Sequence, residues 1–324
     1  MRKTIIVLLG LALAAVAMGA ADQSILTGDK KSMVVVGYST SYQWPGVLQK
    51  MLDEHSGQKG LYTVHNAAVS GSPVAKWLGL TKASDRKKTF DKMVQAFFEP
   101  GERLEGAPKP TLAFFQQSLQ WVYGNHTQGI RAANDAERIE QGADTFLKLA
   151  EQIRALGVDA VYIATHIYKH PMEPEIENEK YALQALFKRG KAFIRPGPEL
   201  CAPTKAVYPK GFQEDKLHPN EIGARIMAIG WYKVLAGDEA NASIIEKANS
   251  GAFDVPSRRS SRGRGQAASF DERDKDRSGD LTPNEFPENV RKRFGRIDAN
   301  DDGRVSRAEY NAYRARGRSR ESSR

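Results

Sequence analysis

Short apolar runs alternate with helix-like segments over most of the chain, and this pattern predicts an α/β domain. Five runs have the length of buried strands: residues 33–37, 61–65, 111–115, 158–164 and 192–194. Between them lie segments whose apolar residues recur every three or four positions, most clearly at residues 135–156, with Gly157 at the end. Strands that alternate with such helices form a mostly parallel sheet covered on both faces. The expected fold is therefore a three-layer α/β/α domain with a mostly parallel five-stranded sheet.

The last helix of this domain is expected to open at Pro219 and to carry Ile222, Ile226 and Ile229 on one face. Proline suits a first helical turn because its missing N–H would have no partner there. Folds of this class gather their functional residues at the carboxyl ends of the parallel strands. Polar residues that directly follow the apolar runs are therefore the first candidates for a site.

The N-terminus has the pattern of a secretory signal peptide, expected to occupy residues 1–21. Arg2 and Lys3 precede an apolar run over residues 4–17. The run is followed by the small residues Gly19, Ala20 and Ala21. Because the run is shorter than the ~20 residues that span a bilayer, cleavage is favoured over a permanent membrane anchor. The mature protein is expected to be secreted or periplasmic, without a membrane span.

The net charge of +9 on the 324 residues is concentrated towards the end of the chain. From residue 257 onwards, 18 Lys and Arg stand against 12 Asp and Glu. Residues 251–268, which contain the stretch SRRSSRGRG, are expected to form a basic flexible linker, and residues 314–324 a basic disordered tail. No aromatic residues interleave with these arginines, so no nucleic-acid partner is expected. Contact with an acidic surface and a merely solubilising role both stay open.

Two acidic loops beyond the linker have the spacing of calcium-binding loops. The first begins DKDRSGDLTPNE, with Gly279 at position 6. Its candidate ligands are Asp274, Asp276, Ser278, Asp280, Thr282 and Glu285. Calcium takes six to eight oxygens, which this spacing supplies from side chains, one backbone carbonyl and a bidentate carboxylate at position 12.

A second loop, DANDDGRVSRAE, follows 24 residues later and has Gly303 at position 6. Its candidate ligands are Asp298, Asn300, Asp302, Arg304 through its carbonyl, Ser306 and Glu309. Two such loops in tandem identify residues 269–313 as a pair of EF-hand motifs, expected to be a small all-α unit that binds two calcium ions. Leu281 and Val305, both at position 8, should form the short β contact between the loops. The expected shared core consists of Phe270, Phe286, Phe294 and Tyr310.

A candidate catalytic motif lies near the end of the larger domain. An aspartate at 215 and a histidine at 218 are separated by two residues and precede Pro219. Such an aspartate can accept a hydrogen bond from the imidazole and leave its other nitrogen free to act as a base. An Asp/His pair at a helix start is also an ordinary cap, so this motif alone leaves both interpretations open.

The order of motifs resembles that of the SGNH (GDSL-type) serine hydrolases over about residues 31–237, within a domain expected to span residues 31–250. The similarity is strongest at DKLHPNEIGARIMA. Gly37-Tyr38-Ser39 follows the first strand, and Asn66-Ala67-Ala68-Val69-Ser70-Gly71 follows the second. The resemblance implies that Ser39 is the nucleophile, His218 the general base and Asp215 its orienting partner. It also implies that the N–H groups of Ser39 and Gly71 form an oxyanion hole, a feature commonly worth a few kcal/mol of barrier.

The chain departs from the family pattern in two blocks. Tyr38 stands where the family has an acidic residue before the nucleophile. The third block lacks a clean Gly-x-Asn-Asp, so the asparagine that should donate to the oxyanion is either Asn125, by residue type, or replaced by Gln120, by position along the strand.

These features predict an exported serine ester hydrolase that works through an acyl-enzyme. The resemblance alone implies its substrate class, an ester-bearing carbohydrate or another small ester. No cofactor is expected for catalysis, and calcium is expected only in the C-terminal loops. The alternative is a non-catalytic, calcium-stabilised binding protein that retains the same fold, an interpretation favoured by the altered first and third blocks.

Overall fold

The computed structural model describes residues 24–99, 109–117, 119, 134–169, 173–256, 270, 274, 276, 278–286 and 294–312. The chain divides into two compact units, Met1–Ser261 and Arg262–Arg324. The expected signal peptide and most of the expected linker lie outside the described residues, as does the tail at 314–324. Within the described part, no helix combines the length and apolar character needed to cross a membrane.

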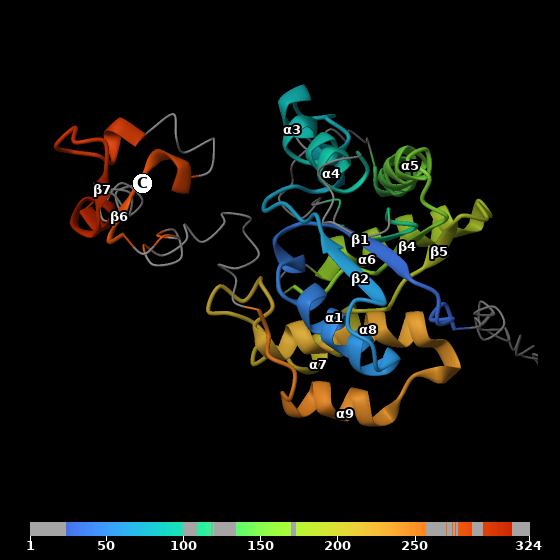
Figure 1. The fold of residues 1–324 in the computed structure, drawn as a ribbon. Helices are drawn as coiled ribbons and strands as arrows, with labels where there is room; N and C mark the ends of the chain where they lie inside the picture. Colours follow the sequence, from blue (N-terminus) through green and yellow to red (C-terminus); the bar gives the residue numbers. More distant parts are fainter. Residues whose placement is uncertain are drawn as a thin grey trace, which may run out of the picture. The chain divides into compact units, whose positions relative to one another are not determined.

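A five-stranded sheet forms the centre of the first unit (Figure 1). Its strands are β1 (Lys31–Gly37), β2 (Tyr62–Asn66), β3 (Leu112–Gln116), β4 (Ala160–Ile163) and β5 (Ile194–Pro196). They run in the order β2-β1-β3-β4-β5, and every neighbouring pair is parallel. The expectation of a mostly parallel five-stranded sheet is confirmed, with the last strand displaced two residues from its predicted start.

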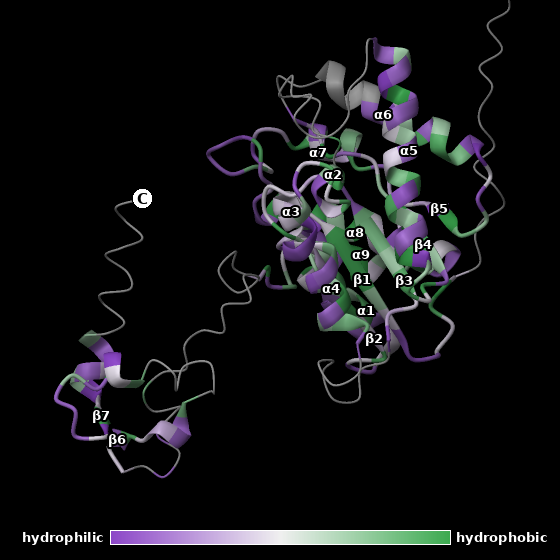
Figure 2. Ribbon diagram, turned by 90° about the horizontal axis from the view of Figure 1, so that it is seen from above, coloured by the Kyte–Doolittle hydropathy of each residue, from purple (hydrophilic) through white to green (hydrophobic). Residues whose placement is uncertain are grey.

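Helices cover both faces of the sheet because successive side chains of a strand point to opposite sides. On one face, Met33 and Val35 of β1 share a core with α1 (Trp44–Ser56), α8 (Glu221–Ala236) and α9 (Ala242–Ser250). On the other, Val34 and Val36 share a core with α2 (Val74–Trp77), α4 (Phe90–Phe97), α5 (Asp135–Arg154) and α6 (Glu173–Lys188). Figure 2 shows the strands between these layers in hydrophobic colours.

Several shorter elements were not predicted from the pattern of apolar residues. They are α2, α4 and α9, together with α3 (Ala83–Lys88) and α7 (Cys201–Ala206). Each has ten residues or fewer, so its amphipathic repeat is too short to stand out in the sequence.

Helix α8 begins at Glu221, so the expected start at Pro219 is wrong by two residues. Asn220 is the N-cap, and its side-chain oxygen accepts from the N–H groups of Ile222 at 2.9 Å and Gly223 at 3.4 Å. Pro219 instead pairs with Phe212 in an isolated antiparallel bridge. An asparagine can satisfy two N–H groups of the first turn, which explains why the helix starts after it.

The first unit continues past the expected domain boundary at residue 250. Phe253 is buried in the core that α1 and α8 share. Pro256 packs against Gly46 of α1, and its carbonyl accepts from the side chain of Gln43 at 3.4 Å. Residues 251–256, expected to open the linker, therefore belong to the packed unit.

The second unit contains a two-stranded antiparallel sheet, β6 (Asp280–Leu281) with β7 (Val305–Ser306), in which Leu281 pairs with Val305. This pairing confirms the expected β contact, and it also departs from the all-α description. The short helical turns η5 (Pro283–Glu285) and η6 (Phe294–Arg296) and a helical segment at 307–312 accompany the sheet. The small core contains all four expected aromatic residues together with Leu281, Ile297 and Val305.

Candidate active site and acidic loops

The turn that carries Ser39 follows β1 directly. Ser39 opens a 3-10 turn, η1 (Ser39–Ser41), and its side chain is half-buried. Gly37 is required before this turn because a Cβ at residue 37 would lie only 2.7 Å from the Cβ of Ser41. The end of β1 is thus packed tightly beneath the turn, while Ser39 itself stays accessible at the carboxyl edge of the sheet.

Three side chains form a continuous hydrogen-bonded row at this edge. The Oδ2 atom of Asp215 lies 2.6 Å from Nδ1 of His218, and Nε2 of His218 lies 2.7 Å from Oγ of Ser39. A carboxylate has no proton to donate, so the proton of the hydrogen bond between Asp215 and His218 sits on Nδ1. Nε2 is then unprotonated and accepts from the Ser39 hydroxyl. The structure therefore brings together Ser39, Asp215 and His218, which lie up to 179 residues apart in the chain.

The loop that carries Asp215 and His218 is held closed by its own backbone. The N–H of Gln213 donates to the carbonyl of His218 at 2.8 Å, and the N–H of Lys216 donates to the carbonyl of Gln213 at 2.8 Å. Lys216 adopts the left-handed region, with φ of 54°. The side chain of Gln213 also donates to the carbonyl of Pro219 at 2.9 Å. These bonds place the imidazole independently of its contact with Ser39.

Asp215 is kept ionised by donors on both of its oxygens. Partial burial alone would raise its pKa, but the N–H groups of His218 and Leu217, each 2.9 Å from Oδ1, and the imidazole at Oδ2 lower the pKa of Asp215 to about 2. A permanently charged carboxylate at this position fixes the ring tautomer and favours a positive charge on the imidazole.

Gly71 lies in the turn after β2 and adopts φ of 63°. Two residues earlier, the N–H of Val69 donates to the carbonyl of Gly37 at 3.1 Å, so this segment runs beside the end of β1. Within the described part of the chain, neither the N–H of Ser39 nor that of Gly71 donates to another residue. Asn125 and Gln120, the two candidates for a third donor, lie outside the described residues.

A buried hydrogen bond beside the turn that carries Ser39 had no signal in the sequence. Tyr38 is 1% exposed, and its hydroxyl lies 2.8 Å from Nε2 of His166. Nδ1 of His166 donates to the carbonyl of Ile167, so Nε2 accepts from the phenol. Burial lowers the pKa of His166 to about 3, with a further lowering by the charge of Lys169. Tyr38 is therefore an uncharged donor to a neutral histidine.

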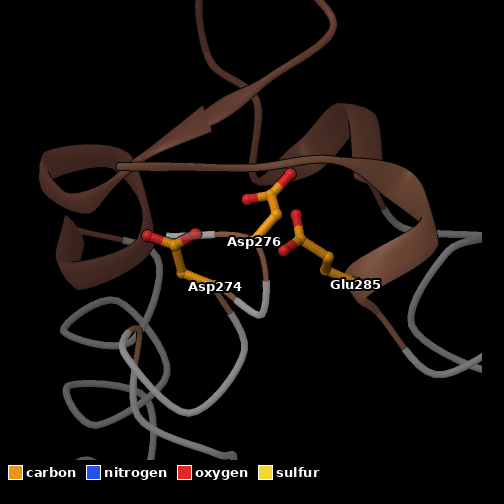
Figure 3. Close-up of side chains that lie close together, drawn as sticks. All are labelled: Asp274, Asp276 and Glu285. Carbon is orange, nitrogen blue, oxygen red and sulfur yellow. The ribbon is translucent and has the colours of Figure 1, made fainter. Parts of the chain in front are cut away.

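The first acidic loop brings its carboxylates together. Oxygens of Asp274, Asp276 and Glu285 lie within 4.8 Å of one another (Figure 3). The carboxylate of Asp274 also accepts from the N–H groups of Ser278 and Gly279 at 2.9 Å each, and Gly279 has φ of 86°. Carboxylate oxygens converging on one point suit a hard cation such as calcium.

Other predicted ligands of this loop hold its conformation. The Ser278 hydroxyl donates to the carbonyl of Asp280 at 2.9 Å. The N–H and hydroxyl of Thr282 donate to one oxygen of Glu285 at 2.8 and 3.0 Å. These contacts orient the Glu285 carboxylate towards the loop.

The second loop repeats the backbone geometry of the first. Oδ2 of Asp298 accepts from the N–H of Gly303 at 3.0 Å, and Gly303 has φ of 78°. The other oxygen of Asp298 is buried without a hydrogen-bond partner among the described residues. A buried carboxylate oxygen without a donor is unfavourable unless a cation binds it, and this fits a calcium ligand at position 1.

The remaining predicted ligands of the second loop are paired with one another. The Asn300 side chain donates to Asp302 at 2.9 Å, and the N–H of Arg304 donates to the other Asp302 oxygen at 2.9 Å. Glu309 accepts from the hydroxyl and N–H of Ser306 and from the N–H of Ala299, and these donors lower its pKa to about 2. Both loops thus contain the predicted residues in matching positions.

No protein-family model matches the chain, and no curated protein matches its sequence. Similar solved structures include TesA, with 19% identity and a TM-score of 0.41 over 61% of this chain and 94% of that protein. They also include Axe2, an acetylxylan esterase from Geobacillus stearothermophilus, with 14% identity and a TM-score of 0.46 over 66% and 98% of the two chains. The lipase Lip_vut3 from a goat rumen metagenome overlaps with 13% identity and a TM-score of 0.46 over 64% and 98%.

Proposed function

We propose that the protein is an exported serine ester hydrolase with Ser39 as nucleophile, His218 as general base and Asp215 as orienting carboxylate. The observation that carries the proposal is the row of hydrogen bonds from Asp215 through His218 to Ser39, at 2.6 and 2.7 Å. If the Asp/His pair were only an ordinary cap, the contacts of Asp215 to backbone N–H groups would suffice. A cap does not need the imidazole to reach a serine at the end of another strand.

The first half-reaction transfers the acyl group to the enzyme. Oγ of Ser39 attacks the ester carbonyl carbon while its proton passes to Nε2 of His218. The carbonyl oxygen becomes an oxyanion, which the N–H groups of Ser39 and Gly71 would receive. When the intermediate collapses, the bond to the leaving alcohol breaks and His218 returns its proton to that oxygen. Ser39 is left acylated.

The second half-reaction regenerates the enzyme. A water molecule attacks the acyl carbon, His218 takes one proton from it, and the same two N–H groups receive the second oxyanion. Collapse breaks the bond to Oγ of Ser39, which recovers the proton, and the carboxylic acid product leaves. Asp215 stays ionised throughout and stabilises the imidazolium that forms in each half.

The proposed substrate is a small ester or an ester carried on a carbohydrate. The side chains of His218 and Asp215 are 24% and 41% exposed. A site this open can receive an ester attached to a larger molecule. Export is proposed from the basic, apolar and small-residue pattern of residues 1–21.

We further propose that the C-terminal unit is an EF-hand pair that binds two calcium ions. The converging oxygens of Asp274, Asp276 and Glu285 support the first site, and the buried, unpaired oxygen of Asp298 supports the second. Ser278, Asp280 and Thr282 would complete the first ligand set. Asn300, Asp302, Arg304, Ser306 and Glu309 would complete the second. Bound calcium would order the two loops and take no part in ester hydrolysis.

The test is a fluorogenic acetyl ester assay combined with labelling by a serine-directed organophosphonate. The wild-type protein should hydrolyse the ester and become labelled at Ser39, and Ser39→Ala should lose both. His218→Ala should also abolish labelling, whereas Ser70→Ala should retain it. Labelling at Ser41 or Ser70 would overturn the assignment of Ser39 as the nucleophile. A folded protein that neither reacts nor turns over would instead favour a non-catalytic binding protein.

A further inference from the structure

The turn that carries Ser39 and the segment that leads to Gly71 are neighbours at the carboxyl edge of the sheet. Strands β1 and β2 are parallel, and the N–H of Val69, beyond the end of β2, donates to the carbonyl of Gly37 at 3.1 Å. Ser39 and Gly71 each lie two residues further along these two segments. The contacts between the segments therefore govern the separation of the two N–H groups that the proposed reaction uses.

The side chain of Asn66, the last residue of β2, joins these two segments. Its Nδ2 donates to the carbonyl of Ser41 at 2.8 Å, and its Oδ1 accepts from the N–H of Ala68 at 3.0 Å. Ser41 closes the 3-10 turn that Ser39 opens. The carbonyl of Ser41 requires a donor and the N–H of Ala68 an acceptor, so only one orientation of the amide satisfies both contacts. Both halves of the half-buried Asn66 amide are thus engaged, one with each segment.

Other contacts hold Gly71 from α2 rather than from β1. The ammonium of Lys76 donates to the carbonyl of Gly71 at 2.8 Å. The indole N–H of Trp77, which is fully buried, donates to the carbonyl of Ser72 at 3.1 Å. These bonds anchor the far side of the turn to the helical layer that contains α2. The Asn66 amide instead ties the near side to the turn that carries Ser39.

An ordinary local turn does not explain both Asn66 contacts. An asparagine that bends its own backbone needs only the bond to the N–H two residues ahead, which is the contact with Ala68. The bond to Ser41 crosses 25 residues of sequence and does not contribute to that bend. Its effect is to restrain one segment against the other.

We propose that Asn66 is a positioning residue that sets the separation of the Ser39 and Gly71 N–H groups in the oxyanion hole. The inference rests on the proposed ester hydrolysis and extends it to a residue that acts through the backbone of others. Both donors have to lie about 3 Å from the oxyanion, so a small shift of either segment weakens one of the two bonds. The loss falls on the transition state, because the negative charge on the carbonyl oxygen develops only there.

The test uses two substitutions that separate the bridge from the local turn. Asn66→Ala removes both hydrogen bonds. Asn66→Ser leaves a hydroxyl that can still accept from the N–H of Ala68 but is too short to reach the carbonyl of Ser41. Both variants should lower kcat for the fluorogenic acetyl ester by about 10- to 100-fold, less than the complete loss of an oxyanion donor. KM should change by less than about threefold.

Butylboronic acid gives a readout that a purely structural role would not move. Oγ of Ser39 donates an electron pair to boron and its proton passes to His218, so the adduct is tetrahedral and negatively charged like the intermediate. The inhibition constant of the boronic acid should therefore rise in both variants by about the factor by which kcat/KM falls.

The matched control is Asn241→Ala. The Oδ1 atom of Asn241 accepts from the N–H groups of Ser243 and Ile244 at the start of α9, at 2.9 and 3.4 Å, outside the proposed site. This variant should lose stability in urea and keep both kcat and the inhibition constant. It separates a general loss of stability from a loss of positioning.

An Asn66→Ser protein with wild-type kcat would overturn the inference and leave the ester hydrolase intact, because the local turn alone would then suffice. An unchanged inhibition constant, or failure of both variants to fold, would also overturn it and assign Asn66 a structural role. If only Asn66→Ala fails to fold, Asn66→Ser decides. If the wild-type protein neither hydrolyses the ester nor binds the boronic acid in a Ser39-dependent manner, the proposed function falls together with the inference.

Discussion

The phenol of Tyr38 and the imidazole of His166 form a buried hydrogen bond of 2.8 Å across 128 residues of sequence. It joins the residue before Ser39 to the segment after β4, a strand two positions away from β1 in the sheet. Because His166 is neutral and its other nitrogen is engaged, the phenol has one defined role, that of donor. The hydrogen bond between Tyr38 and His166 thereby restrains the turn that carries Ser39.

Tyr38→Phe should destabilise the protein by about 1–3 kcal/mol, since it leaves Nε2 of His166 buried without a donor. It should also lower kcat for ester hydrolysis more than it changes KM, because the Ser39 turn loses its support. Urea unfolding and steady-state kinetics measure the two effects. Tyr232→Phe is the matched control, since the Tyr232 hydroxyl also lies 2.9 Å from a histidine, His55, in the other helical layer. It should cost stability without a specific loss of kcat.

Asp215→Asn should keep the fold and lower kcat by about two to four orders of magnitude, because an amide no longer fixes the productive tautomer of His218. Circular dichroism and steady-state kinetics check this pair of expectations. A variant with nearly wild-type kcat would show that Asp215 only caps its loop.

The pH dependence of the protein's stability follows in part from the lowered pKa of Asp215, which is about 2. A carboxylate whose pKa falls on folding stabilises the protein above about pH 4, and that contribution is lost as the pH falls towards 2. Protonation of Asp215 should therefore not limit kcat/KM between pH 5 and 8. Urea unfolding at pH 6, 4 and 2.5 should show a smaller acid-dependent loss of stability for Asp215→Asn than for the wild type.

Two calcium ions per chain should be detected by calorimetry, and each of Glu285→Gln and Glu309→Gln should lower the stoichiometry or weaken binding markedly. The position-12 carboxylate supplies two of the oxygens around each ion, so its loss is costly. Glu246→Gln, an exposed change in α9, is the control and should bind as the wild type. Calcium should raise the melting temperature of the C-terminal unit by linkage. Loss of ester hydrolysis on chelation would contradict the assignment of the metal to these loops.

The sequence was sufficient where short-range patterns determine the structure. The strands of the sheet and α5 follow from runs and repeats of apolar residues, and the contact between Asp215 and His218 lies within four residues. Ser39 became a candidate through the resemblance to the SGNH hydrolases, in which a serine follows the first strand. In the acidic loops, fixed spacing alone indicated Leu281 and Val305 as partners, and the two residues pair in the structure.

The sequence was insufficient where the order of strands brings distant segments together. His166 and Lys169 reach Tyr38 only because β4 lies beyond β3 from β1, an order that no local pattern reveals. The burial of His166 and its hydrogen bond to Tyr38 could not be foreseen from the sequence. The two-residue error at Pro219 arose because Asn220 competes as a cap, and proline alone does not decide where a helix starts.

The packing of Pro256 on Gly46 joins the end of the first unit to α1, the helix that follows the turn that carries Ser39. Any side chain at residue 46 would occupy the space of the Pro256 ring, so the two positions should change together during evolution rather than independently. The same contact bears on where the first unit can be shortened. A chain cut after residue 250 would expose the α1 surface that residues 251–256 cover, whereas one that ends after Pro256 would keep it covered.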